Sequence, residues 1–429
     1  MAEAFKGKHV VIFSGSCLFL SSEKLQQEMN EEIRALSQNG NFELHFTSHQ
    51  NPTSEMLGAI PEGIAFQRRG QPLRDFIEQR WQAGDVVIIC GAVDEDLYVA
   101  ANTKSFLLAA LWVDAKEIVR RYGVPAPTPE KMSAILNIVV NQTCWYYSCS
   151  LVHPIPTKVV SLCCANTCTG KPVSEDEIKM AKALLAILKD GAKNPWIKKA
   201  LLCHLMAAIA HDKDFREVQD WAVTPSSSKK PNEILEYLKE HVRYMMNGRK
   251  AGAVFKRHTC TTKSRDDDPV HRQKNDYIQK HFRSICVSEA YKDKLKGRVV
   301  CVFDDYLTNG QTFEALRNLL VSCKVKKIIF VSVGKFMRGK DNCYIQRDHV
   351  IQGDVYSAKY EATFVQCERR PVKINNTARR SLANLERLAS HLQCIENFTL
   401  QCFFFVVVFF FFFFFWFAYW RDWKLGLVN

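Results

Sequence analysis

The amino-acid sequence predicts an α/β protein with two domains, each built around a parallel β-sheet. Its 429 residues are too many for one ordinary hydrophobic core, so more than one domain is expected. Short runs of apolar, β-branched residues alternate with amphipathic stretches, which is the pattern of parallel strands joined by helices. A content of 47% hydrophobic and 24% charged residues is typical of a globular protein.

The first predicted domain covers residues 1–124. His9–Phe13 and Asp85–Cys90 are expected to be buried parallel strands, because β-branched apolar residues dominate both runs. Residues 22–40 have helical spacing and end at a glycine, which favours a helix between these strands. Leu44–Phe46 predicts a further short strand.

The second predicted domain covers residues 135–395 and follows a proline-rich segment, residues 125–134, that is expected to be a linker. Two long stretches in it have helical spacing, and two apolar runs are typical of buried strands. The helices are expected at 175–188 and 196–211, and the strands at Arg298–Phe303 and Lys326–Val333.

The net charge of +13 is unevenly distributed. Residues 1–130 carry 12 Lys and Arg against 17 Asp and Glu, whereas the remainder carries 46 against 28. A basic half suits an anionic ligand, and the absence of basic runs interleaved with aromatic residues favours a small ligand over nucleic acid. The sixteen cysteines lack paired zinc spacing and the N-terminus lacks a secretory signal, so a cytoplasmic protein with reduced thiols is expected.

Residues 396–429 form a phenylalanine-rich tail. Its central part, Cys402–Trp420, is uncharged and holds eleven of the 28 phenylalanines. Its length fits a membrane span, but its composition is nearly that of a homopolymer. The tail is interpreted either as a translated non-coding tract or as a membrane anchor, and a membrane is an expected partner only in the second case.

The segment Val299–Leu320, VVCVFDDYLTNGQTFEALRNLL, runs from a predicted strand into two adjacent carboxylates, Asp304 and Asp305. A turn follows, in which Gly310 permits close backbone approach, and a helix is expected from about Thr312. A phosphate at this turn would meet backbone N–H groups and the positive end of the helix dipole. The carboxylates can accept hydrogen bonds from vicinal hydroxyls or hold a divalent cation through waters, so a phosphorylated sugar satisfies both halves.

This pattern of four apolar residues, Asp-Asp, two residues and Thr-x-Gly-x-Thr closely resembles the 5-phosphoribosyl-1-pyrophosphate (PRPP) motif of phosphoribosyltransferases. The resemblance implies that the two carboxylates contact the ribose hydroxyls and Mg²⁺, and that the turn binds the 5′-phosphate. Asn309 stands where the family usually has Thr or Ser, but it keeps the capacity to bind a phosphate oxygen. The PRPP-binding residues implied are Asp304, Asp305, Thr308, Asn309, Gly310, Gln311 and Thr312. The alternative is an acidic strand end followed by an ordinary turn.

Two further loops occur in the order that this resemblance implies. Thr224–Asn232, TPSSSKKPN, is placed as the family's pyrophosphate loop is, and Ser226, Ser227 and Ser228 would bind the pyrophosphate. Residues 255–264, with Arg272 and Asn275, are similar to the flexible loop of competence-type phosphoribosyltransferases. The residues expected to offset charge on the leaving pyrophosphate are Lys229, Lys230, Arg257 and Lys263. Ordinary solvated loops remain the alternative.

The first domain resembles a worn haloacid-dehalogenase-type (HAD) domain. That family opens with D-x-D after a strand, where this chain has Ser14 and Ser16. The other matches are Thr47 or Ser48, Gly91 and Asp96, with Ala92 in place of an aspartate. Serine supplies neither the charge for Mg²⁺ nor a weakly activated nucleophile, so the domain is expected to be inactive as a phosphatase. A generic Rossmann-like domain is the alternative.

Together the resemblances imply two Rossmann-like domains, one HAD-like and one of phosphoribosyltransferase type. The expected function is Mg²⁺-dependent transfer of a phosphoribosyl group from PRPP to an unknown nitrogenous, nucleobase-like acceptor, with release of pyrophosphate. A PRPP-binding regulatory module without catalysis and a membrane-tethered scaffold are the alternatives. The sequence does not identify the acceptor, nor does it decide whether the chain forms a homo-oligomer.

Overall fold

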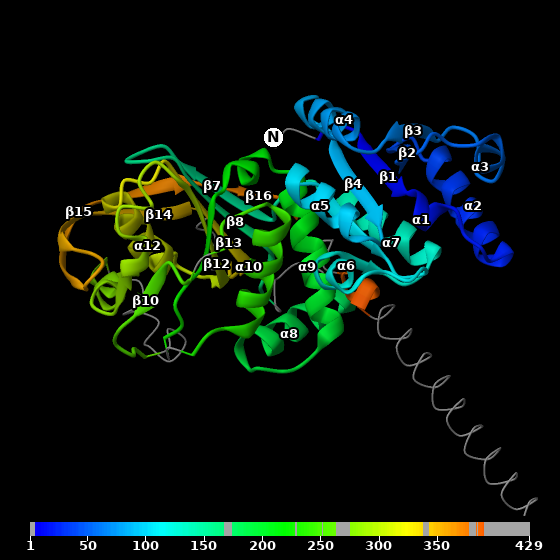
Figure 1. The fold of residues 1–429 in the computed structure, drawn as a ribbon. Coiled ribbons are helices and arrows are strands. Elements are labelled where there is room, and N and C mark those ends of the chain that lie inside the picture. The colour runs from blue at the N-terminus through cyan, green and yellow to red at the C-terminus, as the bar shows by residue number, and fades with distance from the viewer. Residues whose placement is uncertain are drawn as a thin grey trace, which may run out of the picture.

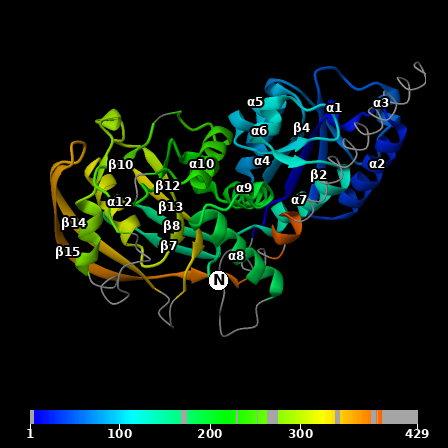
Figure 2. The same cartoon turned by 90° about the horizontal axis from the view of Figure 1, so that it is seen from below.

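The computed structural model describes residues 5–166, 174–227, 230–250, 252–262, 275–337, 343–376, 383 and 385–389. These residues form a mixed α/β protein with two six-stranded sheets and helices between them (Figure 1). A long two-stranded hairpin lies at the end of the molecule remote from the N-terminal sheet, as both views show (Figure 2).

The N-terminal sheet is parallel throughout, with strand order β3-β2-β1-β4-β5-β6. This is the order of a Rossmann-type sheet, in which the strand order reverses between β1 and β4. Every residue of β1 and β4 is buried, which explains their unbroken apolar runs. The strands are β1 (His9–Ser14), β2 (Phe42–Ser48), β3 (Ala65–Arg68), β4 (Val86–Gly91), β5 (Phe106–Ala110) and β6 (Val124–Ala126).

The helices of this half connect its parallel strands. The predicted helix after β1 is confirmed as α2 (Glu23–Gln38), which begins where the Ser22 hydroxyl accepts a hydrogen bond from the Leu25 N–H. The others are α1 (Gly15–Leu18), α3 (Ser54–Gly58), α4 (Gln71–Gln82), α5 (Asp94–Thr103) and α6 (Glu117–Tyr122).

The prediction of a linker at residues 125–134 is wrong. Val124–Ala126 is strand β6, and Pro129–Asn141 is helix α7, which packs against both α2 and α9. Pro125 is tolerated because β6 is an edge strand, and Pro129 because it lies in the first turn of a helix, where its missing N–H is not needed. The segment therefore joins the two halves of the molecule.

The second sheet has the order β16-β7-β8-β13-β12-β9. Strands β8, β13, β12 and β9 are parallel, as predicted, whereas β7 and β16 are antiparallel additions at one edge. The strands are β7 (Tyr147–Leu151), β8 (Thr157–Cys164), β9 (Asp220–Val223), β12 (Val299–Leu307), β13 (Lys327–Lys335) and β16 (Lys373–Ile374).

Two helices lie between the sheets and pack against each other. Helix α9 (Pro195–Ala210) contacts β5 and β6, and from Ala200 to Ile209 it is almost entirely apolar because every residue there is buried. Helix α10 (Glu233–Met245) contacts α5 and α6 on one side and β9 and β12 on the other. One hydrophobic core therefore runs from Phe13 in β1 through Leu136 and Leu205 to Phe303 in β12.

The remaining elements surround the second sheet. The hairpin β14 (Cys343–Asp354) and β15 (Lys359–Pro371) packs on α12 (Gln311–Ser322). The others are α8 (Glu175–Lys189), α11 (Gln279–Phe282), β10 (Phe255–Arg257), β11 (Ile285–Val287) and the short 3₁₀ segments η1 (Lys213–Glu217), η3 (Asn275–Ile278) and η4 (Glu289–Tyr291).

Among the described residues, every helix is too short or too polar to span a bilayer. The phenylalanine-rich tail lies outside them.

Candidate functional site

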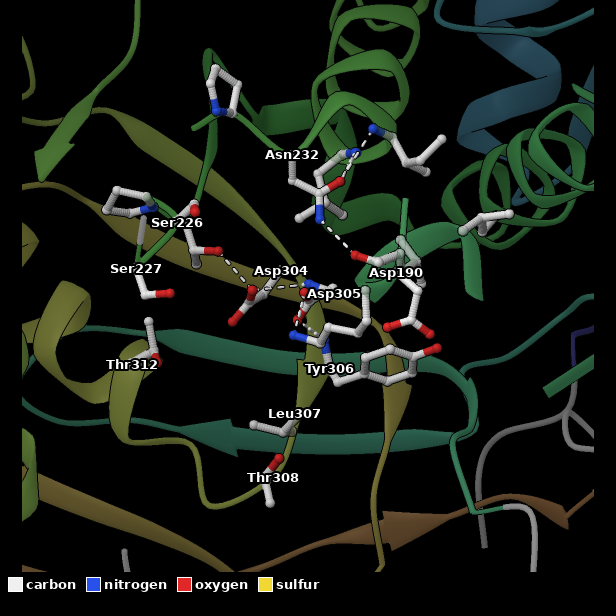
Figure 3. Close-up of a pocket in the computed structure, with 18 of the residues that line it drawn as sticks. Asp190, Ser226, Ser227, Asn232, Asp304, Asp305, Tyr306, Leu307, Thr308 and Thr312 are labelled. Carbon is white, nitrogen blue, oxygen red and sulfur yellow. Dashed lines mark hydrogen bonds and ion pairs between the residues drawn. The ribbon is translucent and has the colours of Figure 1, made fainter. Parts of the chain in front are cut away.

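A cleft of about 1420 Å³ opens at the carboxyl ends of the parallel strands of the second sheet (Figure 3). Because parallel strands end at one edge of a sheet, segments far apart in the sequence meet there. Three predicted segments line the cleft, namely 224–227, 261–262 and 304–312. A fourth, the turn between α8 and α9, was not predicted.

The two carboxylates of the motif are held in different ways. Strand β12 continues to Leu307, so Asp304 and Asp305 lie within the strand and not at its end as predicted. Oδ1 of Asp304 accepts hydrogen bonds from the Thr224 hydroxyl at 2.7 Å and from the Asp305 N–H at 2.9 Å. Oδ2 of Asp305 forms an ion pair with Nζ of Lys189 at 2.5 Å.

These contacts explain how two like charges stand side by side. Burial, and secondarily the charge of Asp305, raises the pKa of Asp304 to about 7. The raised pKa favours the neutral form of Asp304, and the ammonium of Lys189 offsets the charge of Asp305. The pair carries much less negative charge than its sequence suggests.

The turn after β12 is fixed by packing from behind. Gly310 has φ +71° and caps α12, which begins at Gln311, one residue before the predicted start. A Cβ at Gly310 would lie 2.7 Å from Cε2 of Tyr344, so the glycine makes room for a tyrosine ring of the hairpin. Nζ of Lys335 donates to the Thr308 carbonyl oxygen at 2.6 Å. The turn is thus built before any ligand enters.

A buried ionic network holds α12 against β14. The side chains of Glu314 and Arg317 are fully buried and paired at 2.7 Å, and Arg317 also pairs with Asp348 at 2.6 Å. Glu314 further accepts hydrogen bonds from the Tyr344 hydroxyl and the Arg347 N–H. The sequence did not reveal this network, because a Glu and an Arg three residues apart on a helix are ordinarily a solvent-exposed pair.

The predicted pyrophosphate loop borders the cleft. Ser226, Ser227 and Lys230 line it, while Ser228 and Lys229 lie outside the described residues. Figure 3 shows Ser226 and Ser227 on one side of Asp304 and Asp305. The loop after β9 and the carboxylates of β12 therefore border the same cleft.

Arg257, predicted to act on the leaving pyrophosphate, lies beneath this loop. Its guanidinium donates to the Pro225 carbonyl oxygen at 3.1 Å and to Oγ of Ser284 at 2.5 Å. The Thr261 N–H donates to the Ser227 carbonyl oxygen, so the predicted flexible loop supports the serine loop at its described end. Lys263 and Arg272 lie outside the described residues, as does the side chain of Asn275.

The turn between α8 and α9 supplies the residues that the sequence analysis missed. It brings Lys189, Asp190 and Asn194 to the cleft, and Figure 3 shows Asp190 on the side away from Ser226. A lysine in the last turn of a helix is usually explained by its favourable interaction with the helix dipole. The sequence therefore contains no indication that Lys189 pairs with a carboxylate far along the chain. Near Lys189 the rings of Tyr306 and Phe336, whose centres are 5.1 Å apart, form an aromatic part of the cleft lining.

The magnesium site predicted at Asp304 and Asp305 can be judged from their neighbours. In the described part of the chain, no three or more His, Cys, Asp or Glu residues are grouped as metal ligands. Asp304 already accepts two hydrogen bonds, and an ammonium lies where a cation would approach Asp305. Both carboxylates therefore already have protein partners, and the use of magnesium stays a prediction.

The residues that resemble HAD motifs lie close together at the carboxyl edge of the N-terminal sheet, near the ends of β1 and β4. The Arg69 guanidinium, largely buried, pairs with Asp96 and donates to Oγ of Ser14 at 3.1 Å. Asp96 also accepts from the Ala92 and Val93 N–H groups, at 2.9 and 3.1 Å. An arginine therefore supplies the positive charge at this edge.

Of the two candidates for the second motif, Thr47 lies nearer to Ser14. Thr47 lies beside Ser14 in the register of β1 and β2, and it is buried. Ser48, the alternative, accepts a hydrogen bond on Oγ from the Gln50 N–H and lies one residue farther along the strand. Gly91 allows Asp96 to approach, because a Cβ there would lie 2.3 Å from Cβ of Asp96.

Comparisons with known proteins give no match of this chain to a family model, a curated protein or a solved structure. The functional interpretation therefore depends on the residues and geometry of the cleft.

Proposed function

We propose that the protein binds PRPP in the cleft of the second sheet and transfers its phosphoribosyl group to a nitrogenous acceptor. The observation that carries the proposal is the convergence of three segments on one cleft: the Asp304–Asp305 pair, the turn at the start of α12 and the Ser226–Ser227 loop. They suit a diol, a 5′-phosphate and a pyrophosphate respectively.

In the proposed reaction the bond between C1′ and the pyrophosphate oxygen breaks, and its electron pair leaves with pyrophosphate. The lone pair of the acceptor nitrogen forms the new bond to C1′. Lys230, which lines the cleft, would offset the charge that grows on the leaving group, and Lys229 and Lys263 are proposed for the same role. No step is assigned to magnesium in this proposal.

A PRPP-binding regulatory module is the second candidate, favoured by one observation. At the corresponding edge of the N-terminal sheet, the Arg69–Asp96 pair occupies the position where the resemblance implies a catalytic site. Pyrophosphate release separates the two candidates, since only the enzyme produces it.

The proposal is tested by calorimetry with PRPP and by pyrophosphate release with purine, pyrimidine and small-amine acceptors. Saturating PRPP should stabilise the protein, by about 2.7 kcal/mol at 100 times the dissociation constant. Failure of PRPP to bind, with or without Mg²⁺, would overturn both candidates. Binding without pyrophosphate release across the panel would favour the regulatory module.

Substitution of the motif carboxylates gives a sharper test. Asp304→Asn and Asp305→Asn keep the side-chain shape but remove the carboxyl groups beside the proposed ribose hydroxyls. Each should weaken PRPP binding by about 1.5–3 kcal/mol, the value of a hydrogen bond to a charged group. Asp190→Asn is the matched control, because this carboxylate borders the same cleft outside the motif. An equal loss in the control would argue against a specific role for the pair.

A further inference from the structure

We propose that Lys189 takes the place of a divalent cation at Asp305, so that binding of a phosphoribosyl ligand depends on Lys189 and only weakly on magnesium. This inference rests on the proposed function, because it concerns the same cleft. Its basis is the 2.5 Å ion pair between Nζ of Lys189 and Oδ2 of Asp305.

The ion pair joins two elements that are far apart in the sequence. Asp305 lies in β12, whereas Lys189 is the last residue of α8 and begins the turn that borders the cleft. The Asn232 amide donates to the Leu188 carbonyl oxygen at 3.2 Å, which fixes the end of α8 to the start of α10. The ammonium is therefore brought to the carboxylate by the fold and not by chance contact of two surface side chains.

Lys189 also has the access that the role requires. Its side chain is 37% exposed, whereas that of Asp305 is 14% exposed. Nζ lies 5.7 Å from the centre of the Tyr306 ring, so the ammonium is held between a carboxylate and an aromatic face. It can keep one contact with Asp305 while it donates further hydrogen bonds to oxygen atoms of a ligand.

Both carboxylate oxygens of Asp305 already have a partner, which disfavours binding of a second cation there. Oδ1 already accepts the Tyr306 N–H at 2.6 Å, and Oδ2 is the atom paired with the ammonium. A hydrated magnesium ion at this carboxylate would have to displace Lys189, and the displaced charge would then repel it. Lysine and magnesium are therefore alternatives at one position.

The experiment measures PRPP affinity by calorimetry in EDTA and in excess Mg²⁺, for the full-length protein and three variants. Wild type should bind with nearly the same affinity in both buffers. Lys189→Met should bind about ten- to a hundredfold more weakly in EDTA, and Mg²⁺ should restore much of that loss by entering the vacated position. Lys189→Arg, which keeps the charge, should stay close to wild type in EDTA.

Lys193→Met is the matched control, because Lys193 lies on the same turn and borders the same cleft. It should keep the weak magnesium dependence of wild type. Ribose 5-phosphate serves as a second probe, since it lacks the pyrophosphate that chelates magnesium in solution. Melting of each unliganded variant checks that it is folded, and Lys189→Gln replaces Lys189→Met if that variant does not fold.

The outcomes separate this inference from the proposed function. If wild type binds PRPP only with Mg²⁺, and Lys189→Met shows the same dependence, the inference is overturned while PRPP binding stands. If wild type binds PRPP in neither buffer, the proposed function fails. A Lys189→Met variant that binds as wild type does in EDTA also overturns the inference.

Discussion

At the scale of single residues, Gly310 combines two constraints that can be measured separately. Its positive φ disfavours any side chain, and Tyr344 fills the space that a Cβ would take. Gly297 has nearly the same φ, +73°, but faces open space. The two glycines form a natural pair for comparison.

We expect Gly297→Ala to lower the free energy of unfolding by about 1 kcal/mol and Gly310→Ala to lower it by about 2–4 kcal/mol. The difference reports the contact with Tyr344. Urea unfolding of both variants provides the measurement. Equal losses would mean that backbone conformation alone requires Gly310.

Another residue-scale feature is a histidine pair between the two halves. Nε2 of His9, on β1, lies 2.9 Å from Nε2 of His211, at the end of α9. Burial lowers the pKa of His211 to about 4, and it also lowers the pKa of His9. Both rings are therefore neutral in the folded protein at neutral pH.

Since unfolding returns His211 to its ordinary pKa of 6.5, stability from its neutral form is complete above that pH and is lost as the pH falls towards 4. Between pH 7 and pH 5 we expect His211 to cost about 2 kcal/mol of unfolding free energy. His211→Gln should reduce this pH dependence in urea unfolding. His258→Gln, at an exposed position, should leave it unchanged. Identical pH profiles for wild type and His211→Gln would contradict the expectation.

At the scale of elements, helix α12 depends on a salt bridge in the protein interior. Arg317 has no exposed surface, and its removal would leave Glu314 and Asp348 as uncompensated charges. We expect Arg317→Met to destabilise the fold by about 3–5 kcal/mol, against less than about 1 kcal/mol for Lys292→Met in the exposed Lys292–Glu289 pair. Thermal and urea unfolding test this. A small effect of Arg317→Met would mean that water reaches the network.

Strands buried on both faces were the elements best predicted from the sequence. β1, β4, β12 and β13 each contain a buried, mainly apolar run of at least five residues, because this part of each strand is covered on both sides. The hairpin β14–β15 was not predicted, since β15 is largely exposed and rich in charge. The charges of β15 and the irregular register near Asp348 discourage pairing of this edge with another chain. The same charges interrupt the apolar pattern by which a strand is identified in a sequence.

Of the candidate site, too, only one part could be predicted from the sequence. The carboxylate pair and the turn of β12–α12 are contiguous in the sequence, so their pattern could be identified there. Lys189, Arg257 and Tyr344 act through partners 30 or more residues away, which only the strand order brings close. Pro125 and Pro129 led to the wrong prediction of a linker between the domains, because an edge strand and a first helical turn both accept proline.

At the scale of the whole molecule, the two sheets share their hydrophobic core. Helices α7, α9 and α10 contact elements of both halves, and the rings of Tyr122 and Tyr244 stack at 3.9 Å across the boundary. We therefore expect calorimetry to show one cooperative unfolding transition for the full chain. Two well-separated transitions would show that the halves are independent. A fragment beginning at Pro129 should fail to fold, because it lacks the surfaces that cover α9.

The position of α7 has a consequence for how a ligand would be detected. If both sheets open together, a molecule bound in the distant cleft lowers the population of every open form. Protease sites in the N-terminal half, far from the cleft, would then be cut more slowly when the cleft is filled. Resistance of the N-terminal sheet to digestion can thus report binding to the other half of the protein.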